Sequence, residues 1–265
     1  FGNADVAGGT EDRYMGRFML NRFVDKTQVS VVGSANNVND QGFSGGGGPP
    51  RWRRNNGLTA TKMLGVNFAT QTDKLELGGS ARYNYQDGDI ASIGSTEDFL
   101  PDGNSYSNSN SRQRNKAKNF NADFRMEWKP DSMTNIIFRP NFSYGKTDNL
   151  SNSESGTFSS DPYSLVSDPN NWLNLEKILN PDDDPLRSIR INAINSGSLN
   201  DNKSVSTDAT LQLNRKLNDK GRNVTFRGRF GYTNNDNNEH KRRILFDNPV
   251  HHNFKIIHIF YSFLI

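Results

Sequence analysis

Histidine is scarce in this chain and cysteine is absent, so two residue types that are common in catalysis contribute little. The four histidines are His240, His251, His252 and His258, so three of them lie beyond residue 250. A Ser/His/Asp triad needs a histidine as its base, and no other part of the chain supplies one. Cysteine is absent, which removes thiol catalysis and disulfides. We therefore expect no enzyme, no catalytic residue, no metal site and no cofactor.

A run of aspartates is the first candidate ligand-binding group. Asp182, Asp183 and Asp184 lie between Pro181 and Pro185. Carboxylate oxygens bind hard cations such as Ca²⁺, so this run could hold one. The favoured interpretation is a rigid acidic loop surrounded by water.

A tryptophan among arginines is the second candidate group. Arg51, Trp52 and Arg53 follow the glycine-rich stretch 45–48. An indole ring beside guanidinium groups can stack on sugars or bind anions. Contact with lipopolysaccharide phosphates is at least as good an interpretation, so ligand binding by this loop is one of two alternatives.

A second tryptophan falls in a predicted short helix. Asp168 is a suitable N-cap residue and Pro169 suits the first helical position, which predicts a helix from there to about residue 179. Its apolar residues share one face: Trp172, Leu175, Ile178 and Leu179. We expect this stripe to pack against its own loop. The sharper hypothesis is that Trp172 contacts a ligand or a surface partner.

Apolar and polar residues alternate over long stretches of the chain. This pattern predicts β-strands, which would position the candidate groups. In residues 75–87, Leu77 and Tyr83 share one face, and Glu76 and Arg82 share the other. Successive side chains of a strand point to opposite faces, so such a segment predicts a two-faced strand. The alternation recurs in residues 118–129, 134–147, 204–217 and 223–234, and less regularly in residues 13–23, 28–36 and 57–69.

The connections between these segments alternate between short and long. Short joints fall at residues 70–74, 130–133 and 218–222, and long connections at residues 88–116 and 148–203. Outer-membrane barrels combine short periplasmic turns with long extracellular loops. A soluble β-sandwich also alternates, but connections longer than about 12–15 residues are uncommon in compact soluble domains. We therefore predict an all-β, antiparallel, up-and-down transmembrane β-barrel of about eight or more strands.

Aromatic residues support a membrane setting for these strands. If the short joints are periplasmic, five tyrosines lie at the outer ends of the predicted strands and Trp128 lies at an inner end, as in interfacial aromatic girdles. These tyrosines are Tyr14, Tyr83, Tyr85, Tyr144 and Tyr232. Lys62 interrupts the apolar face of residues 57–69. It must lie near a membrane boundary, or the register must change there.

The polar faces carry charges of both signs. They are Glu76, Arg82, Asp123, Arg125, Glu127, Arg139, Asp208, Arg227 and Arg229. In a wide barrel such groups line water or hold a plug domain. The net charge of +3 is too balanced to predict a nucleic-acid partner. No run of about 20 apolar residues predicts a membrane-spanning helix.

The eight predicted strands are expected to be a piece of a larger barrel. The first of them descends toward a short joint, so an ascending strand must precede it, and residues 1–8 fit its end. We assign residues 1–265 to one partial barrel domain, without a signal peptide or plug domain. Residues 254–265 lose the polar alternation, and we interpret them as a truncated or out-of-frame end, or else as a terminal strand.

Short sequence stretches near the start resemble a known family. Asn21-Arg22-Phe23, Thr27-Gln28-Val29-Ser30-Val31 and the following residues 35–44 resemble TonB-dependent receptor-like outer-membrane proteins of Bacteroidetes type. The lead-in Phe1-Gly2-Asn3-Ala4 fits the same pattern. The resemblance is most specific over residues 1–44 and extends to about residue 240.

The resemblance implies a function as well as a fold. It implies an outer-membrane barrel of about 22 strands, an N-terminal plug domain, and uptake of a bound nutrient driven through TonB. Expected partners are outer-membrane lipid, the plug domain, the TonB system and a small nutrient, oligosaccharide or peptide. The alternative is a passive porin-like channel or a structural or adhesive barrel.

Overall fold

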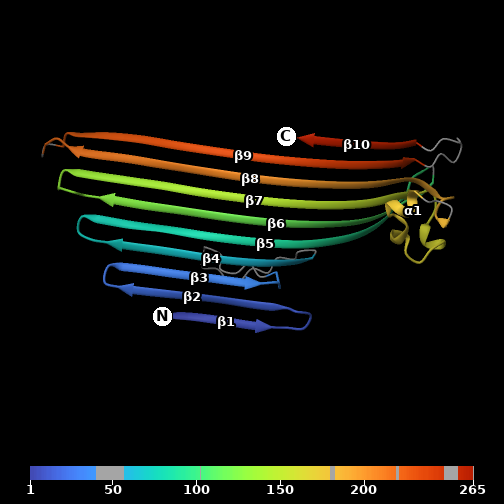
Figure 1. The fold of residues 1–265 in the computed structure, drawn as a ribbon, viewed down its shortest axis with the longest axis horizontal. Helices are drawn as coiled ribbons and strands as arrows, with labels where there is room; N and C mark the ends of the chain where they lie inside the picture. The colour runs from blue at the N-terminus through green and yellow to red at the C-terminus, as the bar shows by residue number, and fades with distance from the viewer. Residues whose placement is uncertain (40–56, 102, 180–182, 219–220, 248–255, 265) are drawn as a thin grey trace. The chain divides into compact units, whose positions relative to one another are not determined.

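The protein is almost entirely an antiparallel β-sheet. The computed structural model describes residues 1–39, 57–101, 103–179, 183–218, 221–247 and 256–264. Ten strands follow each other in up-and-down order, and each pairs with the next strand along the chain (Figure 1). The predicted all-β, antiparallel, up-and-down fold is confirmed. The strand order begins at β1 and ends at β10 in the described part of the chain, so closure into a barrel stays a prediction.

The strands differ greatly in length. They are β1 (Gly2–Gly8), β2 (Tyr14–Val24), β3 (Thr27–Asn36), β4 (Leu58–Gln71), β5 (Leu75–Asp98), β6 (Ser105–Trp128), β7 (Thr134–Phe158), β8 (Arg190–Lys216), β9 (Asn223–Asp247) and β10 (Ile256–Leu264). None of the helices in the described ranges has the length and apolar character that a membrane crossing needs.

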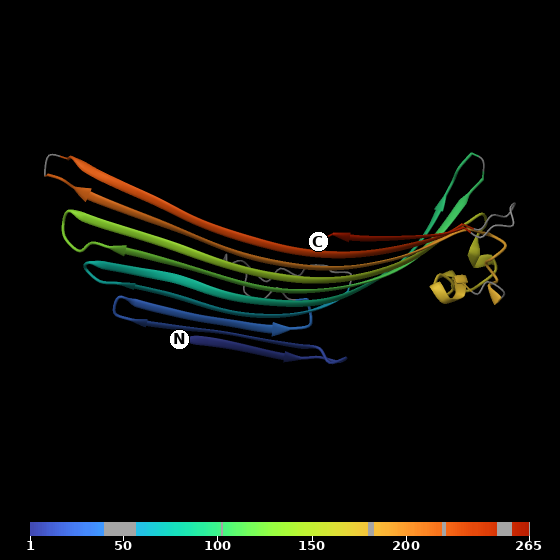
Figure 2. The ribbon, with the colours of Figure 1, turned by 45° about the horizontal axis from the view of Figure 1, so that its top comes forward.

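The chain divides into two compact units, and the division follows the sequence pattern. The first unit comprises Phe1–Asp87, Lys116–Thr147 and Asn202–Asp236. Its boundaries coincide, within about two residues, with the ends of the predicted alternating segments. The second unit comprises Gly88–Asn115, Asp148–Asp201 and Asn237–Ile265. Apolar alternation is therefore a property of the first unit, where Figure 2 shows the strands side by side in a single layer.

Residues 88–116 are largely strand, and both ends of residues 148–203 are strand, so the predicted bounds of the two long loops were wrong. β5 continues to Asp98 and β6 begins at Ser105, which reduces the connection to residues 99–104. β7 continues to Phe158 and β8 begins at Arg190, which reduces the other to residues 159–189. The added strand segments are rich in Ser and Asn and lack alternation, but backbone ladders need no apolar side chains.

Side-chain pairs on the β5–β6 extension also hold it together. Arg112 donates two hydrogen bonds to the carboxylate of Asp89, at 3.0 Å and 2.6 Å.

The greater length of the strands changes where the tyrosines lie along them. Of the five tyrosines, only Tyr14 lies at a strand end, where it begins β2. The others lie within their strands: Tyr83, Tyr85, Tyr144 and Tyr232.

Regular registers connect the first four strands. Phe18 lies opposite Gly33, and Gly33 lies opposite Leu64. Lys62 pairs with Ala35 in an uninterrupted β3–β4 register, so no register change occurs there. β1 confirms the strand predicted within residues 1–8.

The connection between β7 and β8 contains the helices. Among its described residues are the 3₁₀ helices η1 (Pro162–Ser164) and η2 (Pro169–Trp172) and the short helix α1 (Leu175–Leu179). The single helix predicted from residue 169 to 179 is thus split in two. Asp168 caps η2 as predicted, because its carboxylate accepts a hydrogen bond from the Asn170 amide at 3.0 Å.

The C-terminal tail contains the last strand. β10 pairs antiparallel with β9, with Ile256 opposite Asp247 and Leu264 opposite Glu239. The tail therefore forms a strand, which is one of the alternatives that the sequence analysis left open. Whether its sequence is truncated or out of frame stays a prediction.

Candidate functional site

The first unit exposes a broad apolar face. Many side chains that alternate onto this face are solvent-exposed, and Phe230 and Phe226 reach 63% and 59% exposure, whereas Leu77, Phe124 and Phe138 are half-buried. Other exposed members are Leu20, Leu64, Val66, Phe68, Tyr83, Phe142, Leu211, Leu213, Val224 and Tyr232. Contiguous apolar patches of more than a few hundred Å² are rare on monomeric soluble proteins and mark interfaces with membranes or proteins. This face therefore needs an apolar environment.

Aromatic rings contact each other across this face. The ring centroids of Phe68 on β4 and Phe124 on β6 are 6.1 Å apart. Gly79 of β5 lies between them, because a Cβ atom there would come within 3.0 Å of the Phe68 ring. Phe120 and Phe142 form a second pair at 6.0 Å.

Lys62 has a specific neighbour on the apolar face. Its ammonium nitrogen lies 5.9 Å from the centroid of the Tyr85 ring. A cation over an aromatic face is attracted by the ring quadrupole. Tyr85 thus provides Lys62 with a partner that an alternation pattern does not reveal.

The opposite face brings some of the predicted polar residues together. Arg229 and Asp208 form an ion pair at 3.2 Å across β8 and β9. Arg125 and Glu127 pair at 3.1 Å along β6. Asp123 accepts a hydrogen bond from Ser80 of β5.

Other members of the predicted polar set remain apart. Glu76, Arg82, Arg139 and Arg227 form no ion pair with a residue of the described ranges. Glu76 lines a small cavity of about 310 Å³ together with Arg125. The assignment of the whole set to a water-filled lumen, or to a surface that holds a plug, stays a prediction.

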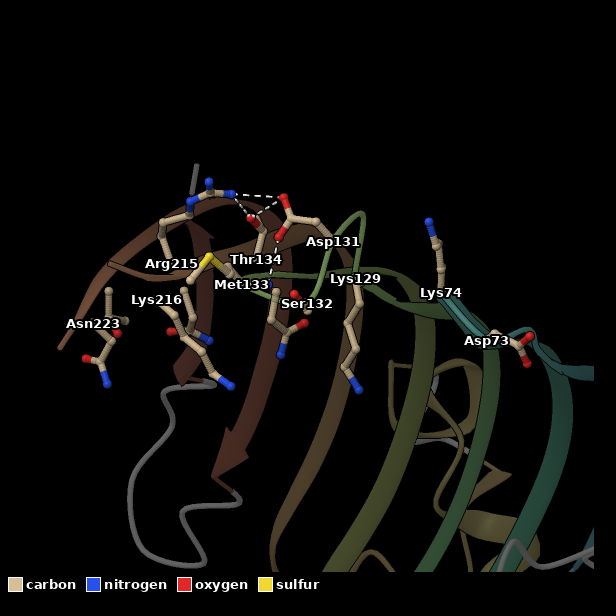
Figure 3. Close-up of a pocket in the computed structure, with 13 residues that line it drawn as sticks. Asp73, Lys74, Lys129, Asp131, Ser132, Met133, Thr134, Arg215, Lys216 and Asn223 are labelled. Carbon is tan, nitrogen blue, oxygen red and sulfur yellow. Dashed lines mark hydrogen bonds and ion pairs between the residues drawn. The ribbon is translucent and has the colours of Figure 1, made fainter. Parts of the chain in front are cut away.

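A larger cavity lies at the short turns of the first unit (Figure 3). Its volume is about 620 Å³, and its lining comes from the β4–β5 and β6–β7 connections and from the neighbouring ends of β7, β8 and β9. Three lysines contribute to it: Lys74, Lys129 and Lys216. The sequence reasoning missed this site. The sequence feature that could have revealed it is that each of these lysines lies at a strand end beside a short joint.

Asp131 organises the turn beside this cavity. Its carboxylate accepts hydrogen bonds from the Met133 amide at 2.8 Å, the Thr134 hydroxyl at 3.0 Å and the Arg215 guanidinium at 2.9 Å. These donors hold the pKa of Asp131 below its ordinary value, the Met133 amide first, then Thr134, then Arg215. Figure 3 shows this network, and Lys129 extends away from it.

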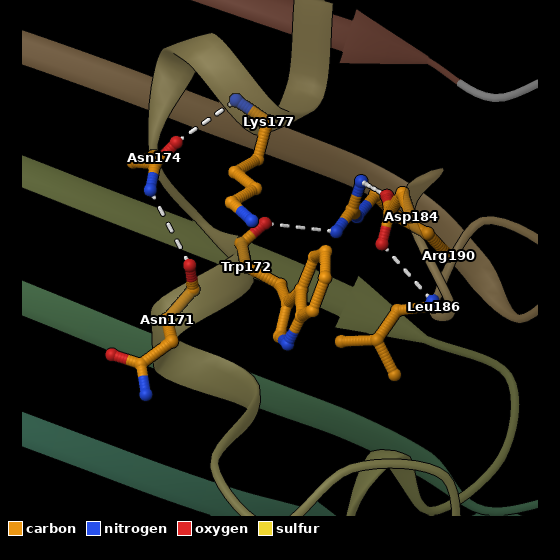
Figure 4. Close-up of polar contacts among 7 residues, drawn as sticks. All are labelled: Asn171, Trp172, Asn174, Lys177, Asp184, Leu186 and Arg190. Atoms are coloured by element: carbon orange, nitrogen blue, oxygen red, sulfur yellow. Dashed lines mark hydrogen bonds and ion pairs between the residues drawn. The ribbon is translucent and has the colours of Figure 1, made fainter. Parts of the chain in front are cut away.

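An ion pair fixes the segment between β7 and β8 (Figure 4). The carboxylate of Asp184 pairs with the guanidinium of Arg190, and both side chains are buried. Arg190 also donates to the Trp172 carbonyl oxygen at 3.0 Å, and Asp184 accepts from the Leu186 amide at 3.0 Å. Burial lowers the pKa of Arg190, while the charge of Asp184 opposes this shift.

These contacts correct the solvated-loop interpretation of the aspartate run. Asp184 is buried and bonded, Asp183 is exposed, and Asp182 lies outside the described residues. The candidates Arg51, Trp52 and Arg53 also lie outside the described residues. Within the ranges that the structure describes, no three His, Cys, Asp or Glu side chains are placed to hold a metal ion.

The apolar residues of this segment pack into two clusters. Phe158, Leu173 and Leu186 form one, with Trp172 against it, and Ile178 belongs to the other. Leu173, which the predicted stripe omitted, is fully buried, whereas Leu179 is exposed. The ammonium of Lys177 lies 4.1 Å from the Trp172 ring centroid. Trp172 thus lies half-buried among residues of its own segment.

Comparisons with known proteins identify no relative. No protein-family model matches the chain, and no curated protein matches it. The two-faced sheet and its turn cavity are therefore the basis for a functional conclusion.

Proposed function

We propose that this chain is part of a transmembrane β-barrel of the outer membrane that takes up a nutrient. The observation that carries the proposal is the exposed apolar face of the first unit, backed by a charged face on the same strands. Lipid matches the first face and water matches the second. A strand that crosses a bilayer needs about 9–11 residues, and β4 to β9 all exceed this length.

The transport part of the proposal is supported by the resemblance of residues 1–44 to TonB-dependent receptor-like proteins. In that reading the barrel imports a bound ligand, and a plug domain and the TonB system couple uptake to energy. The polar face with both charge signs fits a surface that contacts water or a plug.

Flotation with phospholipid vesicles tests the membrane part. The full chain, refolded with phosphatidylcholine vesicles, is expected to float with them. Phe124→Arg and Phe230→Arg are each expected to weaken association, since both residues lie inside their strands and a lipid-facing arginine costs about 2–4 kcal/mol near the bilayer centre. Asn121→Arg places the same charge on the polar face at a similar position along β6 and serves as the matched control. Equal flotation of all three variants would contradict the proposal.

Energy coupling is tested in cells that carry the full-length protein. If uptake of a labelled nutrient stops when TonB is deleted, the coupled receptor is supported. If uptake continues unchanged, the chain belongs to a passive channel instead.

A further inference from the structure

The turn cavity has an excess of positive charge. Its lining contains four basic residues, Lys74, Lys129, Arg215 and Lys216, and two acidic ones, Asp73 and Asp131, which gives a net charge of 4 − 2 = +2. The cavity lies entirely within the first unit. Its charge is therefore set by residues whose relative positions the structure defines.

The acidic residues are already engaged. Asp131 pairs with Arg215 at 2.9 Å, and Asp73 pairs with Lys26 at 3.0 Å. Among the residues that the structure describes, Lys74 and Lys216 have no acidic partner. The uncompensated charge therefore resides on Lys74 and Lys216.

A third lysine of the cavity is oriented by a neighbouring carboxylate. Lys129 lies 3.2 Å from Glu127, whose side chain is 14% exposed and also accepts from Arg125 and Asn135. Glu127 thus fixes the position of the Lys129 ammonium, and Glu127 itself is not among the residues that line the cavity. Fixing a cation before binding lowers the entropy cost of holding an anion.

Alternation places the cavity lysines on the polar face. Lys129 follows Glu127 by two residues, and Lys216 follows Asn214 by two, so each shares a face with that polar neighbour. Asn223 and Thr225 of β9 line the same cavity and can donate hydrogen bonds. A phospholipid on the apolar face would not meet these groups.

We propose that this cavity binds a small anion that carries two or more carboxylate or phosphate groups. Lysine ammonium groups bind such oxygens as point charges, and hydroxyl and amide donors complete the shell. A volume of about 620 Å³ falls within the range of small-molecule sites, about 300–1,000 Å³. The inference deepens the proposed function. It rests on that function in one respect, namely that the bound anion is the transported solute.

Calorimetric titration tests the site with two probes, pyrophosphate and citrate. The full chain in uncharged detergent at low salt is expected to bind at least one of them saturably, and the preferred probe identifies phosphate or carboxylate chemistry. Lys216→Gln is expected to weaken binding about tenfold, because it removes a charged hydrogen-bond donor. Lys118→Gln, in the same unit but outside the cavity, is expected to leave affinity unchanged.

Two results would overturn the inference. One is the absence of saturable binding of both probes at millimolar concentration. The other is wild-type affinity in Lys216→Gln, or an equal loss in Lys118→Gln. Flotation with phosphatidylcholine vesicles, measured on the same preparation, separates this failure from failure of the proposed function. A chain that floats but binds neither probe loses only the anion site.

Discussion

Phe68 and Phe124 are in ring contact although they belong to strands that are not neighbours in the sheet. Their centroids are 6.1 Å apart, and β5 passes between their strands at Gly79. A Cβ atom at Gly79 would lie 2.7 Å from the Asp123 carbonyl oxygen and 3.0 Å from the Phe68 ring. The absence of a side chain at this position lets the two rings meet.

Gly79→Ala is therefore expected to destabilise the sheet. The added methyl group must displace either backbone or ring, which typically costs about 1–3 kcal/mol. The measurement is the free energy of urea unfolding in detergent. Gly78→Ala is the matched control, because its Cβ would lie 3.7 Å from the nearest atom, an ordinary contact. Equal stability of the two variants would show that the ring contact across β5 does not constrain the sheet.

Breaking the Asp184–Arg190 pair should open the segment between β7 and β8. Removal of one partner leaves an uncompensated buried charge, which costs about 3–5 kcal/mol. Asp184→Asn is expected to raise hydrogen exchange of the amides in residues 159–189. Asp183→Asn changes an exposed neighbour and should leave exchange as in the wild type. Unchanged exchange in Asp184→Asn would mean that the apolar clusters hold the segment alone.

The carboxyl group of Asp131 should titrate below its ordinary pKa. Its folded pKa is lowered, so its contribution to stability is present above the unfolded pKa of about 3.9 and is lost as the pH falls through the folded pKa. Arg215→Gln should raise this pKa only partway, because Met133 and Thr134 remain as donors. NMR titration of the carboxyl carbon measures both values. An ordinary pKa in the wild type would refute the network.

Lys62 tests the depth of the apolar face in a bilayer. It lies five residues into β4, counting from Leu58, and contacts Tyr85. A lipid-facing lysine costs about 0–1 kcal/mol near an interface and about 2–4 at the midplane. We expect Lys62→Leu to change stability in vesicles by no more than about 1 kcal/mol, and Val66→Lys to cost about 2–4. Similar effects at both positions would contradict this depth assignment.

The sequence pattern predicts the first unit well and the second poorly. Alternation in residues 75–87 marks β5 as far as the boundary of the first unit, because a strand with one apolar and one polar face has a period of two. Residues 88–98 lack that constraint, so nothing in their composition distinguishes strand from loop. The ladder with β6 and the Asp89–Arg112 pair decide the outcome.

The details of the sites depend on tertiary structure. Asp184 and Arg190 are six residues apart in irregular chain, and their pairing follows from the packing of Leu173 and Leu186 around them. The turn cavity collects residues from the β4–β5 and β6–β7 joints and from the ends of β7, β8 and β9. Only the order of strands in the sheet brings such groups together, and local sequence does not encode it.

Cysteine labelling in membranes tests the central claim most directly, and the absence of native cysteine makes it feasible. Single cysteines replace Leu77, Phe124 and Phe226 on the apolar face, and Arg82, Asp123 and Arg227 on the polar face. The full-length protein in its membrane is then treated with a water-soluble maleimide. We predict that the polar-face positions react and the apolar-face positions do not. Equal reaction on both faces would contradict a lipid-facing sheet.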